Sequence, residues 1–189
     1  MFWFLDNACL NSRCVVSIGK LASQRHYFSL RRKTYGIKDI TKLNIMNIKI
    51  QKVVYLSLEY KETVTLRSSI LRKPLGLKFS NTDLENEKNQ VHFAAFLNGN
   101  VIGTFILVPV SKSDIKIRQV CVHENFQQKG IGLKMMYFAE QYAIKNKYIN
   151  IYCHARKNAV NFYKKLAYKV QGNEFIEVGL AHLKLTKKL

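Results

Sequence analysis

The chain has 189 residues, of which 48% are hydrophobic and 12% aromatic, a composition that excludes an intrinsically disordered protein. Lysine and arginine outnumber aspartate and glutamate by 31 to 12, which gives a formal net charge of +19. No run of about eighteen apolar residues occurs, so we expect no membrane-spanning helix.

The positive charge suits an anionic partner such as nucleic acid, an anionic membrane surface or a phosphorylated ligand. The basic residues are scattered, however, and no block of five or six occurs. A biased genome would also produce the abundance of Lys, Asn, Ile and Tyr. We therefore do not expect nucleic acid or a membrane as the partner.

The four cysteines, Cys9, Cys14, Cys121 and Cys153, form no CxxC pair. Cys121 and Cys153 lie inside apolar, strand-like runs. We expect them to be small buried residues in a reducing compartment, and we expect neither a disulfide framework nor a metal site.

Residues 1–45 differ from the rest of the chain because they show no clear hydrophobic period and carry eight Lys or Arg but only two acids. Two readings stay open. The segment is Arg- and Ser-containing and acid-poor like an organelle transit peptide, or Met46 is the true start. We expect this basic extension to lie outside the fold. The expected location is the cytoplasm, or a mitochondrial or other organelle matrix if the segment is a transit peptide.

From Met46 onward the pattern becomes regular. A strand (48–54) is followed by a helix (56–73) that Pro74 and Gly76 end, and then by a polar stretch. The next elements are a hairpin (91–110) with an Asn-Gly turn, a strand (114–123), a helix (130–146), a strand (148–155), a helix (156–167) and two closing strands (168–172 and 179–187).

The strand–helix–strand unit over 114–154 requires a parallel pair with a crossover, whereas the hairpin is antiparallel. We therefore predict one α/β domain over 46–189, with a mixed sheet and helices on its faces.

Gly130 and Gly132 stand in the first turn of a predicted helix, where each glycine costs about 1 kcal/mol relative to alanine. A helix N-terminus binds anions, and glycines there let phosphate oxygens reach backbone N–H groups. Lys129 and Lys134 would add charge. The alternative is a turn glycine beside a packing glycine. A Walker loop would need Gly-Lys-Ser/Thr, and a dinucleotide fingerprint would need a small residue in place of Met135.

The stretch "QQKGIG" (127–132) resembles the Q/R-x-x-G-x-G/A motif of the GNAT N-acetyltransferase superfamily. The stretches "RQVCVHENFQQKGIG", "NAVNFYKKLAY" and "EVGLAHLKLTKK" resemble the preceding strand and loop, the second signature, and the closing strand of many small bacterial members. The resemblance covers about residues 46–189. Ala167 departs from the pattern, since the family usually has glycine there.

This resemblance implies a mixed, partly splayed antiparallel and parallel sheet in which the strands 114–123 and 148–154 separate and admit acyl-CoA. It implies that pantetheine pairs with backbone groups of the first strand, that pyrophosphate lies on N–H groups of the glycine segment, and that Asn158 contacts the cofactor unless it caps a helix. The implied cofactor-binding residues are Val120, Cys121, Val122, Gln127, Gln128, Lys129, Gly130, Ile131, Gly132, Leu133 and Asn158.

The implied activity is transfer of an acetyl group from acetyl-CoA to a primary amine by direct attack in a ternary complex. Tyr163 matches the tyrosine that protonates the departing thiolate, which is reasonable because a phenol has a pKa near 10 and a thiol near 8.5. The alternative for Tyr163 is aromatic packing. Backbone N–H groups near Val120 or Val122 would hold the oxyanion.

The base that deprotonates the amine is not evident from the sequence. Glu177 and His182 are the first candidates, and His154 and Glu124 are further ones. Cys121 as a nucleophile is not favoured.

A non-catalytic acyl-CoA sensor with the same fold is the alternative function, although such a module would not need Tyr163. The segment 56–90, which usually shapes the acceptor side, carries both signs of charge and so leaves the acceptor open. Its charged residues include Arg67, Arg72, Lys73, Asp83, Glu85 and Glu87. A homodimer is also left open.

Overall fold

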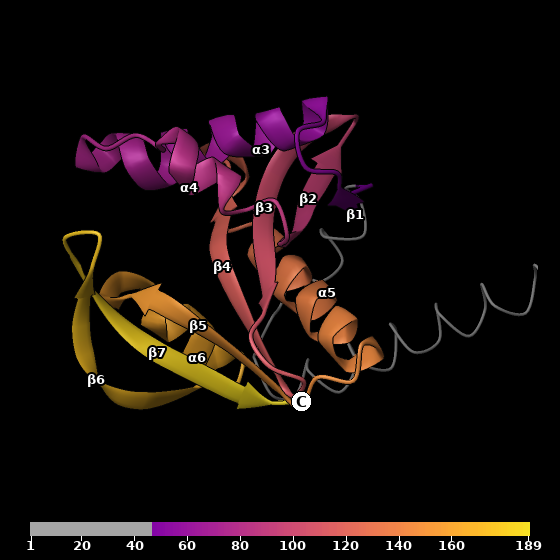
Figure 1. The fold of residues 1–189 in the computed structure, drawn as a ribbon. Coiled ribbons are helices and arrows are strands. Elements are labelled where there is room, and N and C mark those ends of the chain that lie inside the picture. The colour runs from indigo at the N-terminus through magenta and orange to yellow at the C-terminus, as the bar shows by residue number, and fades with distance from the viewer. Residues whose placement is uncertain (1–46) are drawn as a thin grey trace, which may run out of the picture. The chain divides into compact units, whose positions relative to one another are not determined.

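Seven strands form one sheet in the computed structural model, which describes residues 47–189 (Figure 1). Residues 1–46 lie outside the described residues, and with them the expectations for the basic extension, Cys9 and Cys14. The spatial order is β1-β2-β3-β4-β5-β7-β6. The strands are β1 (Lys49–Val53), β2 (Val91–Leu97), β3 (Asn100–Pro109), β4 (Asp114–Val122), β5 (Asn150–Arg156), β6 (Lys169–Glu177) and β7 (Leu180–Lys188).

All neighbouring strands pair antiparallel except β4 and β5, which are parallel. The parallel ladder joins only 114–117 of β4 to 150–153 of β5. Beyond that point β4 stays on β3 and β5 stays on β7, so the two strands separate toward their carboxyl ends. Figure 1 shows this divergence from a shared end near the C-terminus. The predicted mixed, partly splayed sheet is confirmed.

The joined end of this parallel pair is held by side chains. Asn150 donates a hydrogen bond of 2.9 Å to Asp114, and Ser111 and Ser113 donate to the other carboxylate oxygen of Asp114 at 2.6 and 2.7 Å. These hydrogen bonds, from Ser111 first, lower the pKa of Asp114 to about 2. The carboxylate therefore stays ionised and binds both strands where the splay begins.

Helices lie on both faces of the sheet. The α-helices are α3 (Leu58–Arg67), α4 (Asn81–Glu85), α5 (Ile131–Lys145) and α6 (Val160–Lys165). Short helical turns are η1 (Ser68–Arg72), η2 (Lys73–Leu75), η3 (Glu124–Phe126) and η4 (Lys157–Ala159). The predicted helix at 56–73 is thus α3 continued by a π-helical and a 3-10 turn, which Gly76 ends in the left-handed region at φ 69°.

The helix α5 lies on the face that holds the main core. A side chain on Gly103 of β3 would meet the Met135 sulfur at 2.7 Å, so glycine permits this close approach. On the other face α3 packs through Tyr60 against Val53 and Ala94. Strand alternation then assigns every residue of β4 and β5 to one of these faces.

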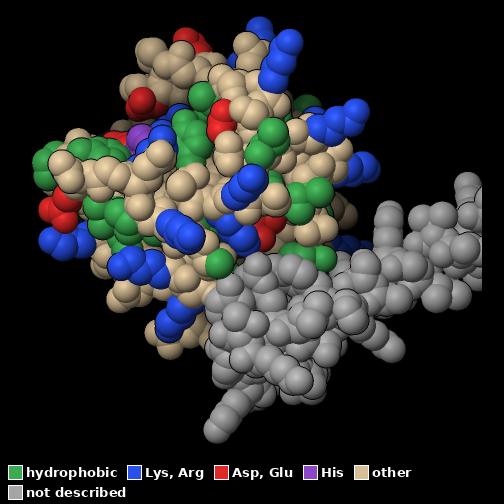
Figure 2. Space-filling model, turned by 90° about the horizontal axis from the view of Figure 1, so that it is seen from below, with side chains coloured by type: hydrophobic (Ala, Val, Ile, Leu, Met, Phe, Trp, Pro, Cys, Tyr) green, Lys and Arg blue, Asp and Glu red, His purple; other side chains and the backbone are tan. Residues whose placement is uncertain are grey.

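Positive charge is spread over the surface, and Figure 2 shows Lys and Arg side chains at many separate places on one face, with few acids among them. Among residues 47–189 there is no helix with both the length and the apolar character needed to cross a membrane.

Candidate active site

A cavity of about 690 Å³ lies where β4 and β5 have separated. We call it the slot. Its walls come from the ends of both strands, the loop before α5, the helix α6, the turn η1 and the turn between β6 and β7. Of the cofactor-binding residues implied by the resemblance, the slot is lined by Val120, Cys121, Val122, Gln127, Gln128, Gly130, Gly132, Leu133 and Asn158.

The N-terminus of α5 opens on the slot. Gly130 is the N-cap and has φ 78°, a left-handed conformation that glycine adopts without strain. The N–H groups of the first helical turn have no backbone or side-chain acceptor among the described residues. Gln127 fixes the loop by donating 2.9 Å to the Val122 carbonyl. Free donors therefore face a cavity bordered by glycine.

Gly132 has a packing role as well. A Cβ at this position would lie 3.4 Å from Cζ of Phe162 on α6, so a larger side chain would press α6 away from α5. Both alternatives for these glycines fit the structure. Gly130 is a turn glycine that also lines the slot, and Gly132 packs against Phe162 and lines the slot as well.

Two expectations about the charge of this segment need correction. Lys134 does not add charge at the glycines, because its ammonium group donates 2.6 Å to the Ile48 carbonyl. Lys129 does not line the slot and donates 2.8 Å to the Asn125 carbonyl. The Ile131 side chain is buried in the core, so only the backbone of Ile131 could meet a ligand.

A β-bulge interrupts β4 at the mouth of the splay. The register against β3 shifts between Thr104 and Ile106, and Gln119 has φ 53° on the opposite strand. A bulge leaves backbone groups unpaired and redirects them. The backbone of Val120 is thereby turned out of the regular ladder, at the place where the sequence predicted an oxyanion contact.

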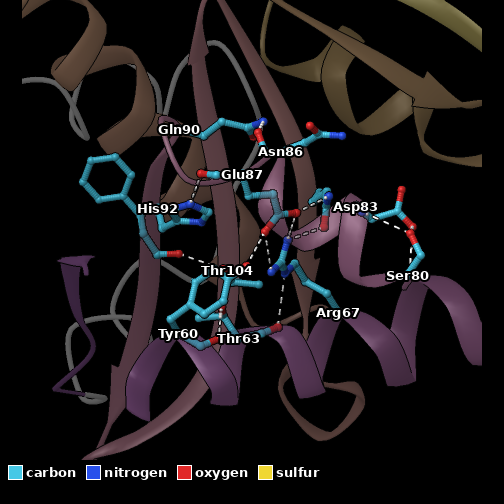
Figure 3. A network of polar contacts seen from close by, with 12 residues as sticks. Tyr60, Thr63, Arg67, Ser80, Asp83, Asn86, Glu87, Gln90, His92 and Thr104 are labelled. Atoms are coloured by element: carbon cyan, nitrogen blue, oxygen red, sulfur yellow. Dashed lines mark hydrogen bonds and ion pairs between the residues drawn. The ribbon is translucent and has the colours of Figure 1, made fainter. Parts of the chain in front are cut away.

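The bulge is held by a buried ionic network (Figure 3). Arg67 binds Glu87 through two hydrogen bonds of 2.6 and 3.0 Å and donates 2.5 Å to the Gln119 side chain, which in turn donates 2.9 Å to Glu87. Tyr60 donates a further 2.9 Å to Glu87. Arg67 and Glu87 are 0% and 1% exposed, so their charges stabilise the bulge. The sequence left open whether the charged residues of segment 56–90 face the acceptor, and these two do not.

Tyr163 projects from α6 toward β5 and lines the slot. Burial, and then the neighbouring Cys153 thiol, raise the pKa of Tyr163 well above its ordinary value, so the phenol is protonated at neutral pH. Burial raises the pKa of the Cys121 thiol to about 12, which does not favour Cys121 as a nucleophile.

The helix α6 ends with two crossed hydrogen bonds, from Tyr168 N–H to the Tyr163 carbonyl and from Ala167 N–H to the Lys164 carbonyl. This is a Schellman motif, and it places Ala167 at φ 66°. The family's glycine is therefore replaced by a residue for which the left-handed conformation is strained.

His154 and His182 both line the slot. His154 Nδ1 lies 2.6 Å from the Glu177 carboxylate and 3.2 Å from the Lys116 ammonium group. The shorter contact forms a hydrogen bond when Nδ1 carries the proton, because an ionised carboxylate only accepts. Burial tends to raise the pKa of Glu177, but the hydrogen bond and charge of His154, with Lys116, bring it below its usual value. His182 Nδ1 lies 2.8 Å from the Leu180 carbonyl and so donates to it. In a neutral ring with its proton on Nδ1, Nε2 is the proton acceptor.

The two remaining candidate site residues, Asn158 and Glu124, differ in whether they line the slot. Asn158 lines the slot and caps neither η4 nor α6, whose N-caps are Arg156 and Ala159. Glu124 is exposed in η3 and does not line the slot. Among the described residues, no three His, Cys, Asp or Glu side chains gather closely enough to hold a metal ion.

Three cationic residues of the slot were not singled out from the sequence, namely Lys116, Arg118 and Arg156. A usable signal existed in "DIKIRQVCV", where two cations alternate with buried isoleucines on a strand of the predicted parallel pair. Such a strand has no solvent face, so the alternation indicates a cavity.

The family model described as an acetyltransferase (GNAT) domain matches residues 74–189. The chain belongs to the GNAT acetyltransferase family. The protein YyaT of Bacillus subtilis (strain 168) is 29% identical over 75 residues, which are 39% of this chain and 50% of YyaT. The match therefore spans half the length of that relative.

Solved structures of GNAT proteins share the fold. A GNAT family acetyltransferase from Elizabethkingia anophelis with acetyl-CoA bound superposes with a TM-score of 0.60 at 19% identity, over 76% of this chain and 99% of that one. An aminoglycoside 6'-N-acetyltransferase complexed with coenzyme A gives a TM-score of 0.63 at 14% identity, over 74% and 96%.

Proposed function

We propose that this GNAT protein transfers an acetyl group from acetyl-CoA to a primary amine by direct attack in a ternary complex, and that residues 46–189 suffice for this activity. The observation that carries the proposal is the slot between β4 and β5. It joins free N–H donors at the start of α5 to Tyr163 on α6 within one cavity. The two neighbours described above contain acetyl-CoA and coenzyme A on the same fold.

The residues present fit such a co-substrate. The first turn of α5 and the Gln128–Gly130 loop would hold the pyrophosphate, because free N–H groups and the helix dipole favour an anion. Val120, Val122 and Leu133 supply apolar wall for the pantetheine arm, and the bulge at Gln119 supplies unpaired backbone.

Proton transfer would use both sides of the slot. The Nε2 atoms of His154 and His182 can accept the proton that the amine loses, while Tyr163 can give its phenolic proton to the leaving sulfur. Attack of the amine on the acetyl carbonyl carbon would form the carbon–nitrogen bond and a tetrahedral oxyanion. The carbon–sulfur bond would then break, and one proton would pass from amine to thiol overall.

Binding of CoA is the first test. At one hundred times its dissociation constant, CoA should stabilise the protein by about 2.7 kcal/mol, and NADH or ATP at equal concentration should do so much less. Gly130→Val should weaken CoA binding. Gly76→Val is the matched control, since Gly76 also has a left-handed φ of 69° but lies outside the slot. No thermal shift with millimolar CoA would contradict the proposal, and turnover absent in spite of CoA binding would favour a sensor.

A further inference from the structure

The wall of the slot on the α3 and η1 face is strongly cationic. Arg72 of η1, Lys116 and Arg118 of β4, and Arg156 of β5 all line the cavity. Glu177 is the one carboxylate among the residues that line it, and one of its oxygens is already bound by His154.

The three arginines of this wall are not neutralised within the described part of the chain. None forms an ion pair there, and the guanidinium group of Arg118 makes no hydrogen bond among these residues. Arg72 lies over the Phe79 ring, 4.7 Å from its centroid, and Arg156 gives one N–H to the Leu71 carbonyl at 2.7 Å. A guanidinium has five N–H donors, so most of their donors are unused.

These cations act on one another. The charge of Arg72 adds to burial in lowering the pKa of Arg156. Burial lowers the pKa of Lys116 as well, against the opposing charge of Glu177 and with a further contribution from Arg118. The carboxylate of Asp83 is exposed and accepts two hydrogen bonds of 2.9 Å from Ser80. These bonds are the main cause that lowers the pKa of Asp83, and the charges of Arg72 and Arg118 contribute less. Like charges held together at a half-buried wall are unfavourable unless an anion joins them.

We propose that this wall holds an anionic group of the acceptor, a carboxylate or a phosphate carried by the same small molecule as the reacting amine. The inference rests on the proposed N-acetyltransferase function. Arginine binds both kinds of anion through two parallel hydrogen bonds, which fixes the position of the bound molecule.

The position of the wall fits this role. Strand alternation puts Arg118 and His154 on one face of the sheet, and Cys153, beside Tyr163, on the other. An acceptor held by the arginines therefore has its amine beside an imidazole, with Tyr163 across the slot. The same cations lower the pKa of a nearby ammonium group, which raises the fraction of neutral, nucleophilic amine. They also repel polycationic amines.

Binding of product-like amides tests the proposal without turnover. Full-length protein, with CoA added, is titrated in a calorimeter with N-acetylated amino acids of varied side chain, with N-acetylated phosphoethanolamine, and with the neutral N-acetylethanolamine. We expect at least one anionic amide to bind at least tenfold more tightly than the neutral one. The better of the two anionic series identifies carboxylate or phosphate. Equal affinity for neutral and anionic amides would overturn the proposal.

A charge-matched pair of variants completes the test. Arg118→Gln should weaken binding of the anionic amide about 10- to 100-fold and raise the KM of the matching amine similarly, with the dissociation constant of CoA unchanged. Lys52→Gln removes one exposed charge from β1, outside the slot, and should change neither. Equal losses in both variants would overturn the proposal, whereas failure of CoA to bind wild-type protein would contradict the proposed function instead.

Discussion

On the face covered by α5 and α6, the slot is bordered by apolar side chains, glycines and the hydroxyl of Tyr163. On the face covered by α3 and η1, it is bordered by cations, and behind them lies the buried pair Arg67–Glu87. The first face suits an anionic ligand whose negative charge lies at the N-terminus of α5. The second face holds two kinds of charged side chain: the buried Arg67, which is paired with Glu87, and the arginines of the slot wall, which form no ion pair among the described residues.

The contrast within the second face is informative. Arg67 has two hydrogen bonds to one carboxylate and one to Gln119, and it is fully buried. Arg118 stands next to Gln119 on β4, and its guanidinium group has no such partner among residues 47–189. An arginine that is paired and buried maintains backbone geometry, whereas one that is unpaired and borders a cavity is available to a ligand.

The largest effect is expected on the apolar face. Tyr163→Phe removes one hydroxyl and keeps the ring, so kcat should fall about 10²- to 10⁴-fold while the affinity for CoA stays nearly unchanged. Tyr168→Phe is the control, because Tyr168 is also buried and lies beside Tyr163 but does not line the slot. Steady-state thiol release measures both. Full activity of Tyr163→Phe would make Tyr163 a packing residue and would leave protonation of the thiolate to water.

On the charged face, Arg67→Met should destabilise the fold by about 3–5 kcal/mol, because it leaves the Glu87 carboxylate buried and uncompensated. Arg118→Met removes the same guanidinium and should change the free energy of unfolding by no more than about 0.5 kcal/mol. Urea denaturation of both variants gives the comparison directly. The double variant Arg67→Met/Glu87→Leu should recover part of the loss, and similar losses in the two single variants would remove the distinction drawn above.

The smallest effect concerns the end of α6. Ala167→Gly should stabilise the protein by roughly 0.5–1 kcal/mol, since relief of the left-handed strain exceeds the entropic cost of glycine. Ala159→Gly, at an ordinary φ of −94°, should not stabilise. Thermal unfolding distinguishes the two. A destabilised Ala167→Gly would mean that the Ala167 methyl group has packing value that outweighs the strain.

Local sequence signals predicted most of the fold. The hairpin turn was evident from Asn98 and Gly99, which have φ of 51° and 84° as a two-residue turn of this type requires. The closing strand predicted at 168–172 extends as β6 to Glu177, because a bulge after Gln171 carries the ladder past Gly172. The five-residue helix α4 was not predicted, since its signal is a single capping box of Ser80 and Asp83.

The candidate site was predicted less evenly. Gly130 and Tyr163 stand in short motifs, so each could be found from its neighbours in the chain. Arg67 and Gln119 are 52 residues apart, and no local pattern indicates that they meet. Their contact depends on the packing of α3 against β4, which is a property of the assembled fold.

The hydrogen bond between Asn150 and Asp114 fixes β4 and β5 at their joined end, so a small change of angle there becomes a larger displacement at the separated ends. From the end of the four-residue ladder to Val122, β4 advances about 16 Å, at roughly 3.3 Å per residue. A change of about four degrees between the strands would therefore move the far end by about 1 Å. A misplacement of that size is enough to slow an enzyme about 100-fold. The hydrogen bond between Asn150 and Asp114 thus limits how far the backbone near Val122 can move from its position in the slot.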